Sequence, residues 1–95
     1  MSMVVGILSV EISLEGCLSL KDKRQVVRSL IGRVKSRFNA SVAEVDLMNR
    51  HQRGVIGAAL VSNDRRHMDA QIDHLLNFIE ADGRFSVVSV QRELY

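Results

Sequence analysis

Basic side chains gather in one short stretch of the sequence. Seven of the thirteen Lys and Arg residues lie between Lys21 and Arg37, and Asp22 is the only acid among them. If this stretch is a helix, four of the seven project within about 60° of one another, beside the apolar stripe. The four are Lys21, Arg24, Arg28 and Lys35. Such a ridge can bind consecutive phosphates of a nucleic acid, or it can be an ordinary solvated helix face.

A second group of basic residues follows in the polar stretch 49–53. If the chain forms a β-hairpin there, the hairpin tip lies at the same end of the sheet as the start of the basic helix. The residues expected to meet at this end are Lys21, Lys23, Arg24, Arg50, His51, Arg53 and Arg84. Free N–H groups at a helix N-terminus also attract anions, so the sequence predicts an unspecific anion-binding end. The alternative is that the tip is polar only because it is in water.

The remaining reactive side chains do not form a site. Glu11 and Glu44 are expected about 9–10 Å apart, with another strand between them, so one ion would not bridge them. His67 and His74 stand two helical turns, about 10 Å, apart, which is too far for one metal ion. Cys17 is the only cysteine and is expected to be a partly buried, inert thiol. We therefore predict no catalytic residue, no metal site, no cofactor and no enzymatic activity.

The strands and helices that position these residues can be predicted from the spacing of the apolar residues, which alternates between two periods along the chain. A period of two predicts strands and a period near 3.6 predicts helices. The predicted elements are a strand over 3–14, a helix over 20–38, strands over 41–48 and 55–61, a helix from a cap at Asn63 or Asp64 to 82–83, and a strand over 85–94. This order predicts an α+β ferredoxin-like βαββαβ sandwich. One domain, 1–95, would hold a four-stranded antiparallel sheet of order 4-1-3-2 with two helices on one face.

The other face of that sheet is expected to be open and acidic. Ala43, Val45 and Leu47 are assigned to the helix side, and polar residues to the open side. The open-side residues are Ser9, Glu11, Ser13, Glu44, Asp46, Gln91 and Glu93. No aromatic residue falls in the first or third strand, so base stacking on the sheet, as in an RNA-recognition motif, is not predicted.

Composition limits the class of protein. The 95 residues are 46% hydrophobic and 25% charged with a net charge of +2, which is typical of a small globular domain. The longest apolar run, 55–61, is too short to span a bilayer, and no basic segment precedes the first apolar strand as in a signal peptide. A single cysteine suits a reducing compartment. We expect a cytoplasmic protein without a membrane partner.

Three stretches of the chain resemble a known bacterial family. They are Ser19-Leu-Lys-Asp-Lys-Arg24, Val42-Ala-Glu-Val-Asp46 and Val61-Ser-Asn-Asp64. In order and spacing they resemble the YlxP-like family, a small domain of unknown function, over nearly the whole chain. The resemblance implies a ferredoxin-like fold. It also implies an RNA or ribosome connection, because genes of the family often lie beside those for translation factors and ribosome-binding factor A. The family usually has an aromatic residue at the hairpin tip, and this chain has none there.

Two hypotheses follow from these observations. The leading one is a non-enzymatic domain that binds ribosomal or other RNA through the phosphate backbone. Its predicted contact residues are Lys21, Lys23, Arg24, Arg28, Lys35, Arg50 and Arg53. The alternative is a regulatory module, a homodimer or a binder of protein or small ligands, that uses the open sheet face.

Overall fold

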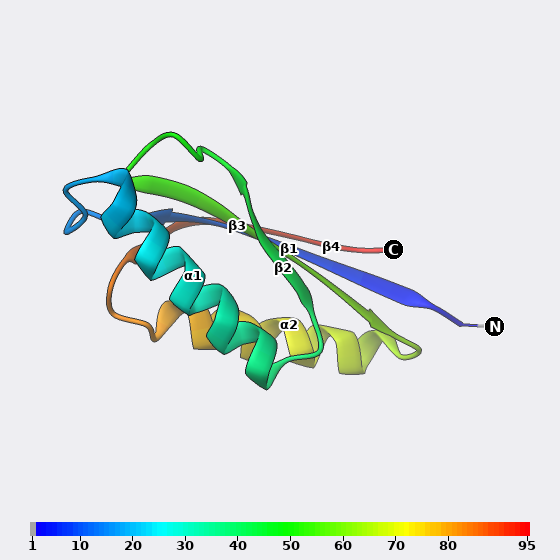
Figure 1. The fold of residues 1–95 in the computed structure, drawn as a ribbon. Coiled ribbons are helices and arrows are strands. Elements are labelled where there is room, and N and C mark those ends of the chain that lie inside the picture. The colour runs from blue at the N-terminus through cyan, green and yellow to red at the C-terminus, as the bar shows by residue number, and fades with distance from the viewer. Residues whose placement is uncertain (1) are drawn as a thin grey trace.

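A computed structural model describes residues 2–95. Its helices and strands follow one another in the order that the sequence pattern predicts. The elements are β1 (Val4–Ser13), α1 (Leu20–Arg37), β2 (Ser41–Asp46), β3 (Arg53–Ser62), α2 (Arg65–Glu80) and β4 (Ser86–Leu94). Figure 1 shows both helices on one side of a single twisted sheet. Predicted and observed ends differ by one or two residues at most positions, as is usual for fraying termini.

The sheet is antiparallel throughout, with β1 at its centre. Its strand order is β2-β3-β1-β4, which confirms the predicted ferredoxin-like arrangement. β1 pairs with β3 from Val4 opposite Ser62 to Ser13 opposite Arg53, and on its other side with β4. β2 and β4 are therefore the two edge strands.

The hydrophobic core lies between the sheet and the two helices. Leu8, Val10 and Ile12 of β1 are fully buried there, against the apolar stripes of α1 and α2. Packing is closest at Gly6, where a Cβ would overlap the Met68 sulfur of α2. Neither helix in residues 2–95 is long and apolar enough to cross a membrane.

Both helices begin at side-chain caps, and the cap of α2 is Asp64, one of the two predicted residues. The Ser19 hydroxyl accepts a hydrogen bond from the Asp22 N–H at 3.1 Å, and the Asp22 carboxylate accepts one from the Leu18 N–H at 3.0 Å. The Asp64 carboxylate accepts from two N–H groups in the first turn of α2. These side chains satisfy backbone donors that have no partner inside a helix.

The alternation assigned to β2 was wrong. Val42 is buried and Glu44 is half-buried on the helix side, whereas Ala43 and Val45 are exposed on the open side. The pairing with β3 shifts between Glu44 and Asp46, so a β-bulge returns Asp46 to the open side. An extra residue in a strand moves every later side chain to the other face, and β2 holds too few residues to reveal this in its sequence.

Candidate functional site

The start of α1 and the β2–β3 hairpin are joined by one buried cation, Lys23. Its side chain is 1% exposed, and its ammonium lies 2.7 Å from a carboxylate oxygen of Glu44. The same nitrogen donates to the carbonyls of Leu47 at 2.8 Å and Arg50 at 2.7 Å. The ammonium therefore has its hydrogen bonds with backbone carbonyls and its charge beside a carboxylate, all inside the protein. Lys23 is therefore not available for a phosphate, and its prediction as a contact residue was wrong.

Further contacts hold the hairpin loop in place. The Gln52 side chain donates to the carbonyls of Glu15 and Cys17, and the Leu14 N–H donates to the Gln52 carbonyl. Leu47 has a φ of 58°, a left-handed conformation that is uncommon for a residue with a side chain. Its N–H donates to the Asp46 carboxylate at 2.8 Å, which supports that turn. The loop thus has a defined position relative to the first turn of α1.

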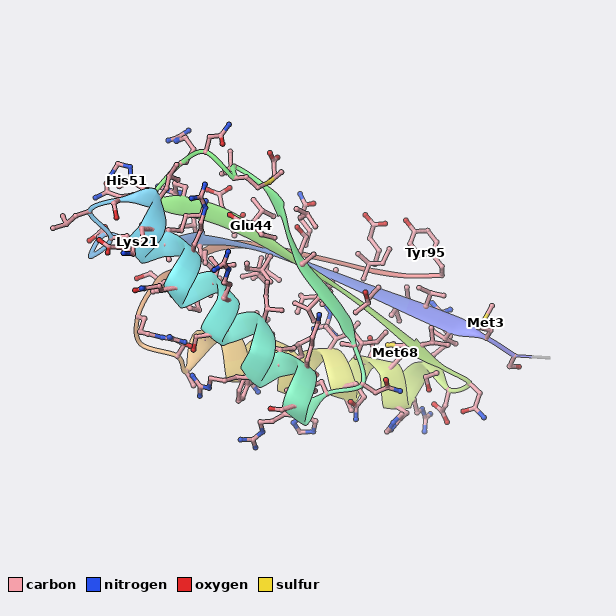
Figure 2. All side chains as sticks on the ribbon, viewed as in Figure 1. Met3, Lys21, Glu44, His51, Met68 and Tyr95 are labelled. Atoms are coloured by element: carbon pink, nitrogen blue, oxygen red, sulfur yellow. The ribbon has the colours of Figure 1, made fainter. Side chains whose placement is uncertain are left out.

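The four ridge residues are all exposed along α1; they are Lys21, Arg24, Arg28 and Lys35. None of them forms an ion pair with any described residue. From Lys21 to Lys35 the helix rises about 21 Å. At 100° per residue they project about 120° from the buried stripe, on the flank of α1 away from α2. The predicted ridge is thus a continuous line of unpaired positive charge, at one end of which Figure 2 labels Lys21.

The other flank of α1 carries cations that are occupied. Arg33 lies 3.1 Å from the Asp82 carboxylate, and the guanidinium groups of Arg33 and Arg37 each lie 5.1 Å from the centre of the Phe78 ring. Asp82 also accepts two hydrogen bonds from the Arg84 guanidinium. These bonds from Arg84, with further attraction from Arg33, lower the pKa of the Asp82 carboxyl. The seven basic residues of α1 therefore divide into two groups: Lys23, Arg33 and Arg37 contact partners within the protein, and the four ridge residues form no ion pair with a described residue.

The predicted anion-binding end is only partly assembled. Arg50 and His51 are exposed in the hairpin loop, and Figure 2 shows His51 at the same end of the molecule as Lys21. Arg53 instead points to the open face, where its guanidinium lies 2.7 Å from the Glu11 carboxylate. Arg84 is held by Asp82. Of the residues predicted for this end, Arg50 is exposed in the loop whose backbone bonds to Lys23 of α1, while Arg53 and Arg84 have carboxylate partners.

The acidic residues of α2 lie far from the ridge. Asp69 and Asp73 face β4, where Asp73 lies 2.6 Å from the Arg92 guanidinium. By helical periodicity, His67, Gln71 and His74 form the opposite flank of α2, the one toward α1. The surface of the helix layer thus changes from basic on α1, through neutral polar, to acidic next to β4.

The open sheet face is not uniformly acidic, contrary to the prediction. Its polar half holds Ser9, Glu11, Asp46, Ser89 and Gln91 around a shallow depression. Glu44 is absent from this half because it faces the helices.

The other half of the open face is apolar. Ile7, Val45 and Val61 are 37%, 53% and 65% exposed, and Ala43 and Ala59 lie between them. Met3 and Tyr95, also exposed, lie at the same end of the molecule as this half (Figure 2). The sequence contained a signal for this patch in the run 55–61, whose alternate residues must face away from the core.

The remaining candidate ligands are separate in space. Glu11 and Glu44 lie on opposite faces of the sheet. His67 and His74 are exposed along α2. Cys17 is 5% exposed, and burial raises the pKa of its thiol, with a further contribution from Asp22. A higher pKa leaves less of the reactive thiolate at neutral pH.

Sequence reasoning missed a cavity at the C-terminal end of α1. It has a volume of about 480 Å³ and lies between the last turn of α1 and α2. The lining residues are Arg37, Phe38, Gln71, His74, Asn77 and Phe78. Phe38 and Phe78 pack edge to face, with their ring centres 5.7 Å apart. The two phenylalanines lie forty residues apart in sequence, so only the fold brings them together.

Comparisons with known proteins identify relatives but no activity. Residues 5–92 match a family described as "Protein of unknown function (DUF503)". The "Uncharacterized protein YlxP" of Bacillus subtilis (strain 168) is 31% identical over 78 residues, which cover 82% of this chain and 85% of that protein.

Among solved structures, a "De novo designed protein Foldit4" is similar with a TM-score of 0.58. The likeness covers 99% of this chain and 97% of the designed one at 14% identity, so it concerns the fold alone. The family match and the relative confirm the resemblance seen in the sequence. The chain belongs to the DUF503 family, and the YlxP protein of Bacillus subtilis is its relative.

Proposed function

We propose that this protein is a non-enzymatic domain that binds RNA through its phosphate backbone. The binding surface is the basic ridge of Lys21, Arg24, Arg28 and Lys35, extended at one end by Arg50 on the hairpin tip. It acts in the cytoplasm, on ribosomal or other RNA. The proposal no longer includes Lys23 or Arg53, because carboxylates already hold them.

One observation carries this proposal: four exposed cations form a line of about 21 Å without a single carboxylate partner among the described residues. Carboxylates on a helix normally accompany such residues, because oppositely charged neighbours stabilise the helix. Here the acids closest to α1 have other partners: Asp22 accepts from the Leu18 N–H, Glu44 pairs with Lys23, and Asp82 pairs with Arg33 and Arg84. A polyanion that approaches the ridge therefore meets little repulsion and can release counterions on binding.

The buried ion pair of Lys23 supports the same surface indirectly. It ties the hairpin loop to the first turn of α1 through the Leu47 and Arg50 carbonyls. The backbone of Arg50 is consequently held at the first turn of α1, where the ridge begins. A preorganised surface loses less conformational entropy on binding than a mobile one.

The test compares two charge reversals of equal size. Arg24→Glu with Arg28→Glu changes the ridge, and Arg65→Glu with Arg66→Glu changes an exposed pair on α2 that has no ion pair in residues 2–95. Binding of a ribosomal RNA fragment is measured at several salt concentrations. The ridge variant should bind at least tenfold more weakly, with a salt slope reduced by roughly 1 to 2. The α2 variant should bind much like the unchanged protein. Equal effects from the two pairs would refute the proposal.

The apolar half of the open face favours a second candidate, self-association as a homodimer. Two copies related by a twofold axis would bury Ile7, Val45 and Val61 against the same residues of the partner copy. In that arrangement Glu11 and Asp46 of each copy lie in the polar half, away from the contact. Exposed apolar patches of this kind often mark interfaces.

Sedimentation at several concentrations tests this second candidate. Val61→Arg should dissociate the dimer, whereas Ser13→Arg in the polar half should not. A monomer at every concentration would exclude it.

A further inference from the structure

We infer that the cavity at the C-terminal end of α1 holds an unstacked nucleobase together with its phosphate. This inference rests on the proposed RNA binding and adds to it a place where bases, rather than only phosphates, are contacted. The base would lie between α1 and α2, against Phe38 and Phe78, and the phosphate would lie at Arg37.

The first argument is the position of the cavity relative to the ridge. The helices cross at an angle (Figure 1), and α1 contacts α2 through Arg33 and Arg37 in its last turns. Lys35, the last ridge residue, and Arg37 belong to the same turn but project about 160° apart around α1. A strand that follows the ridge therefore has to pass around the C-terminal end of α1, over residues 38–40, to reach the cavity, and residues 38–40 include no acid.

The second argument is the chemistry of the cavity wall. Phe38 and Phe78 are both half-buried, so part of each ring is accessible at the cavity. Aromatic rings and Arg guanidinium planes are the groups on which proteins stack unpaired RNA bases. The Arg37 guanidinium already lies over the Phe78 ring at 5.1 Å, so its outer plane extends the stacking surface.

The third argument concerns hydrogen bonding. Gln71, His74 and Asn77 line the cavity, and the two side-chain amides each offer a donor and an acceptor without a net charge. A side-chain amide can pair with both the amino group and the ring nitrogen on one edge of adenine. A volume of about 480 Å³ is in the range of small-ligand sites. Adenine is therefore the base that best fits this set of groups.

Arg37 is the residue for the phosphate because its guanidinium contacts the Phe78 ring but no carboxylate of the described residues. Arg33 is bound to Asp82, whereas Arg37 has no carboxylate partner among residues 2–95. Its N–H groups therefore remain for an anion. The charge of Arg37 continues the ridge around the end of α1, and the neutral residues of α2 form the opposite wall.

The experiment uses the full chain and six-nucleotide RNAs of a single base, with adenosine monophosphate as the free-nucleotide probe. The unchanged protein should bind the adenine oligomer at least about fivefold more tightly than the uracil oligomer. Asn77→Ala and Gln71→Ala leave the net charge unchanged, so they should reduce this ratio toward one and leave the salt slope unaltered. Gln25→Ala, an exposed amide on α1, is the matched control and should keep the ratio.

Backbone NMR spectra identify the source of the base. Shifts at residues 71–78 with the oligomer support a site for an RNA strand, and shifts with the monophosphate alone support a site for a free nucleotide. Equal affinities for both oligomers, or a preference that survives both amide variants, would overturn the inference. If the protein binds both oligomers equally and this binding still depends on Arg24 and Arg28, the inference about the cavity fails and the proposed RNA binding stands. If no RNA binds at all, the proposed function fails as well.

Discussion

Two groups of cations on α1 differ in what surrounds them, although the sequence places them side by side. Lys23 is enclosed by a carboxylate and two close carbonyls, whereas its neighbour Arg24 is exposed and unpaired. The first cation joins two parts of the chain and the second offers its charge to solvent. A run of basic residues therefore cannot be assigned to one role, because helical rotation alternates its members between the core edge and the surface.

The largest expected effect comes from removing the buried cation. Lys23→Met leaves the half-buried Glu44 carboxylate without its partner and removes the donor to the Leu47 and Arg50 carbonyls. Breaking a buried ion pair from one side costs about 3–5 kcal/mol, which is a large part of the stability of a small domain. Urea denaturation measures the free energy of unfolding. The control Lys21→Met, on the exposed flank, should change it by less than about 0.5 kcal/mol. Equal effects of the two variants would show that Lys23 has no special role.

A second variant separates the charge from the carbonyl contacts. Lys23→Met combined with Glu44→Leu removes both charges, so no uncompensated carboxylate remains. The double variant should be more stable than Lys23→Met alone, with about 1–2 kcal/mol of the loss remaining because the loop carbonyls still lack a donor. A double variant as unstable as the single one would place the whole effect in the loop.

Lys23 and Glu44 also show how much of the structure could be predicted from the sequence. The order of elements, the strand order and both helix caps were predictable, because they depend on local periods and on side chains three residues apart. The inward position of Glu44 was not, since Glu44 and Asp46 were expected on the same face and the β-bulge between them places them on opposite faces. With Glu44 assigned to the open face, Lys23 had no visible partner and was counted with the ridge.

The ridge itself was predictable from spacing alone, but the cavity beside it was not. Lys21, Arg24 and Arg28 recur on one helix flank, so their common exposure follows from the geometry of a single helix. Phe38 and Phe78 meet only because α1 and α2 cross near those residues. The family resemblance was equally visible in the sequence, and two of its stretches, around Lys23 and Glu44, are joined by the buried ion pair.

A smaller effect is expected from changing Asp82, the carboxylate that pairs with Arg33 and Arg84. The pKa of its partner Asp82 is lowered, first by the hydrogen bonds from Arg84. A carboxyl with a lower pKa in the folded state stabilises the protein above its unfolded pKa of 3.8 and loses that contribution as the pH falls through the folded value. Asp82→Asn should cost up to about 1 kcal/mol at pH 7 and much less at pH 2. Thermal unfolding at both pH values measures this difference. The same loss at both values would argue against the ion pairs.

The smallest effect on stability is expected from substitutions on the ridge. Unlike the earlier variants, these should stabilise the protein. Arg24 and Arg28 are four residues apart, a spacing at which like charges destabilise a helix by about 0.2–0.5 kcal/mol. Arg28→Glu replaces this repulsion with attraction and should raise the free energy of unfolding by a few tenths of a kcal/mol. Arg28→Gln, which only removes the repulsion, should give a smaller gain. Both variants should bind RNA more weakly than the unchanged protein.

A gain in stability combined with a loss of binding would mean that the ridge charges are retained at a cost to the fold, as at many functional surfaces. Denaturation and RNA titration on the same samples measure both quantities. A loss of more than about 1 kcal/mol for Arg28→Gln would instead reveal a structural role for this side chain. Arg28 would then belong with Lys23, and the division of the α1 cations into two groups would no longer hold.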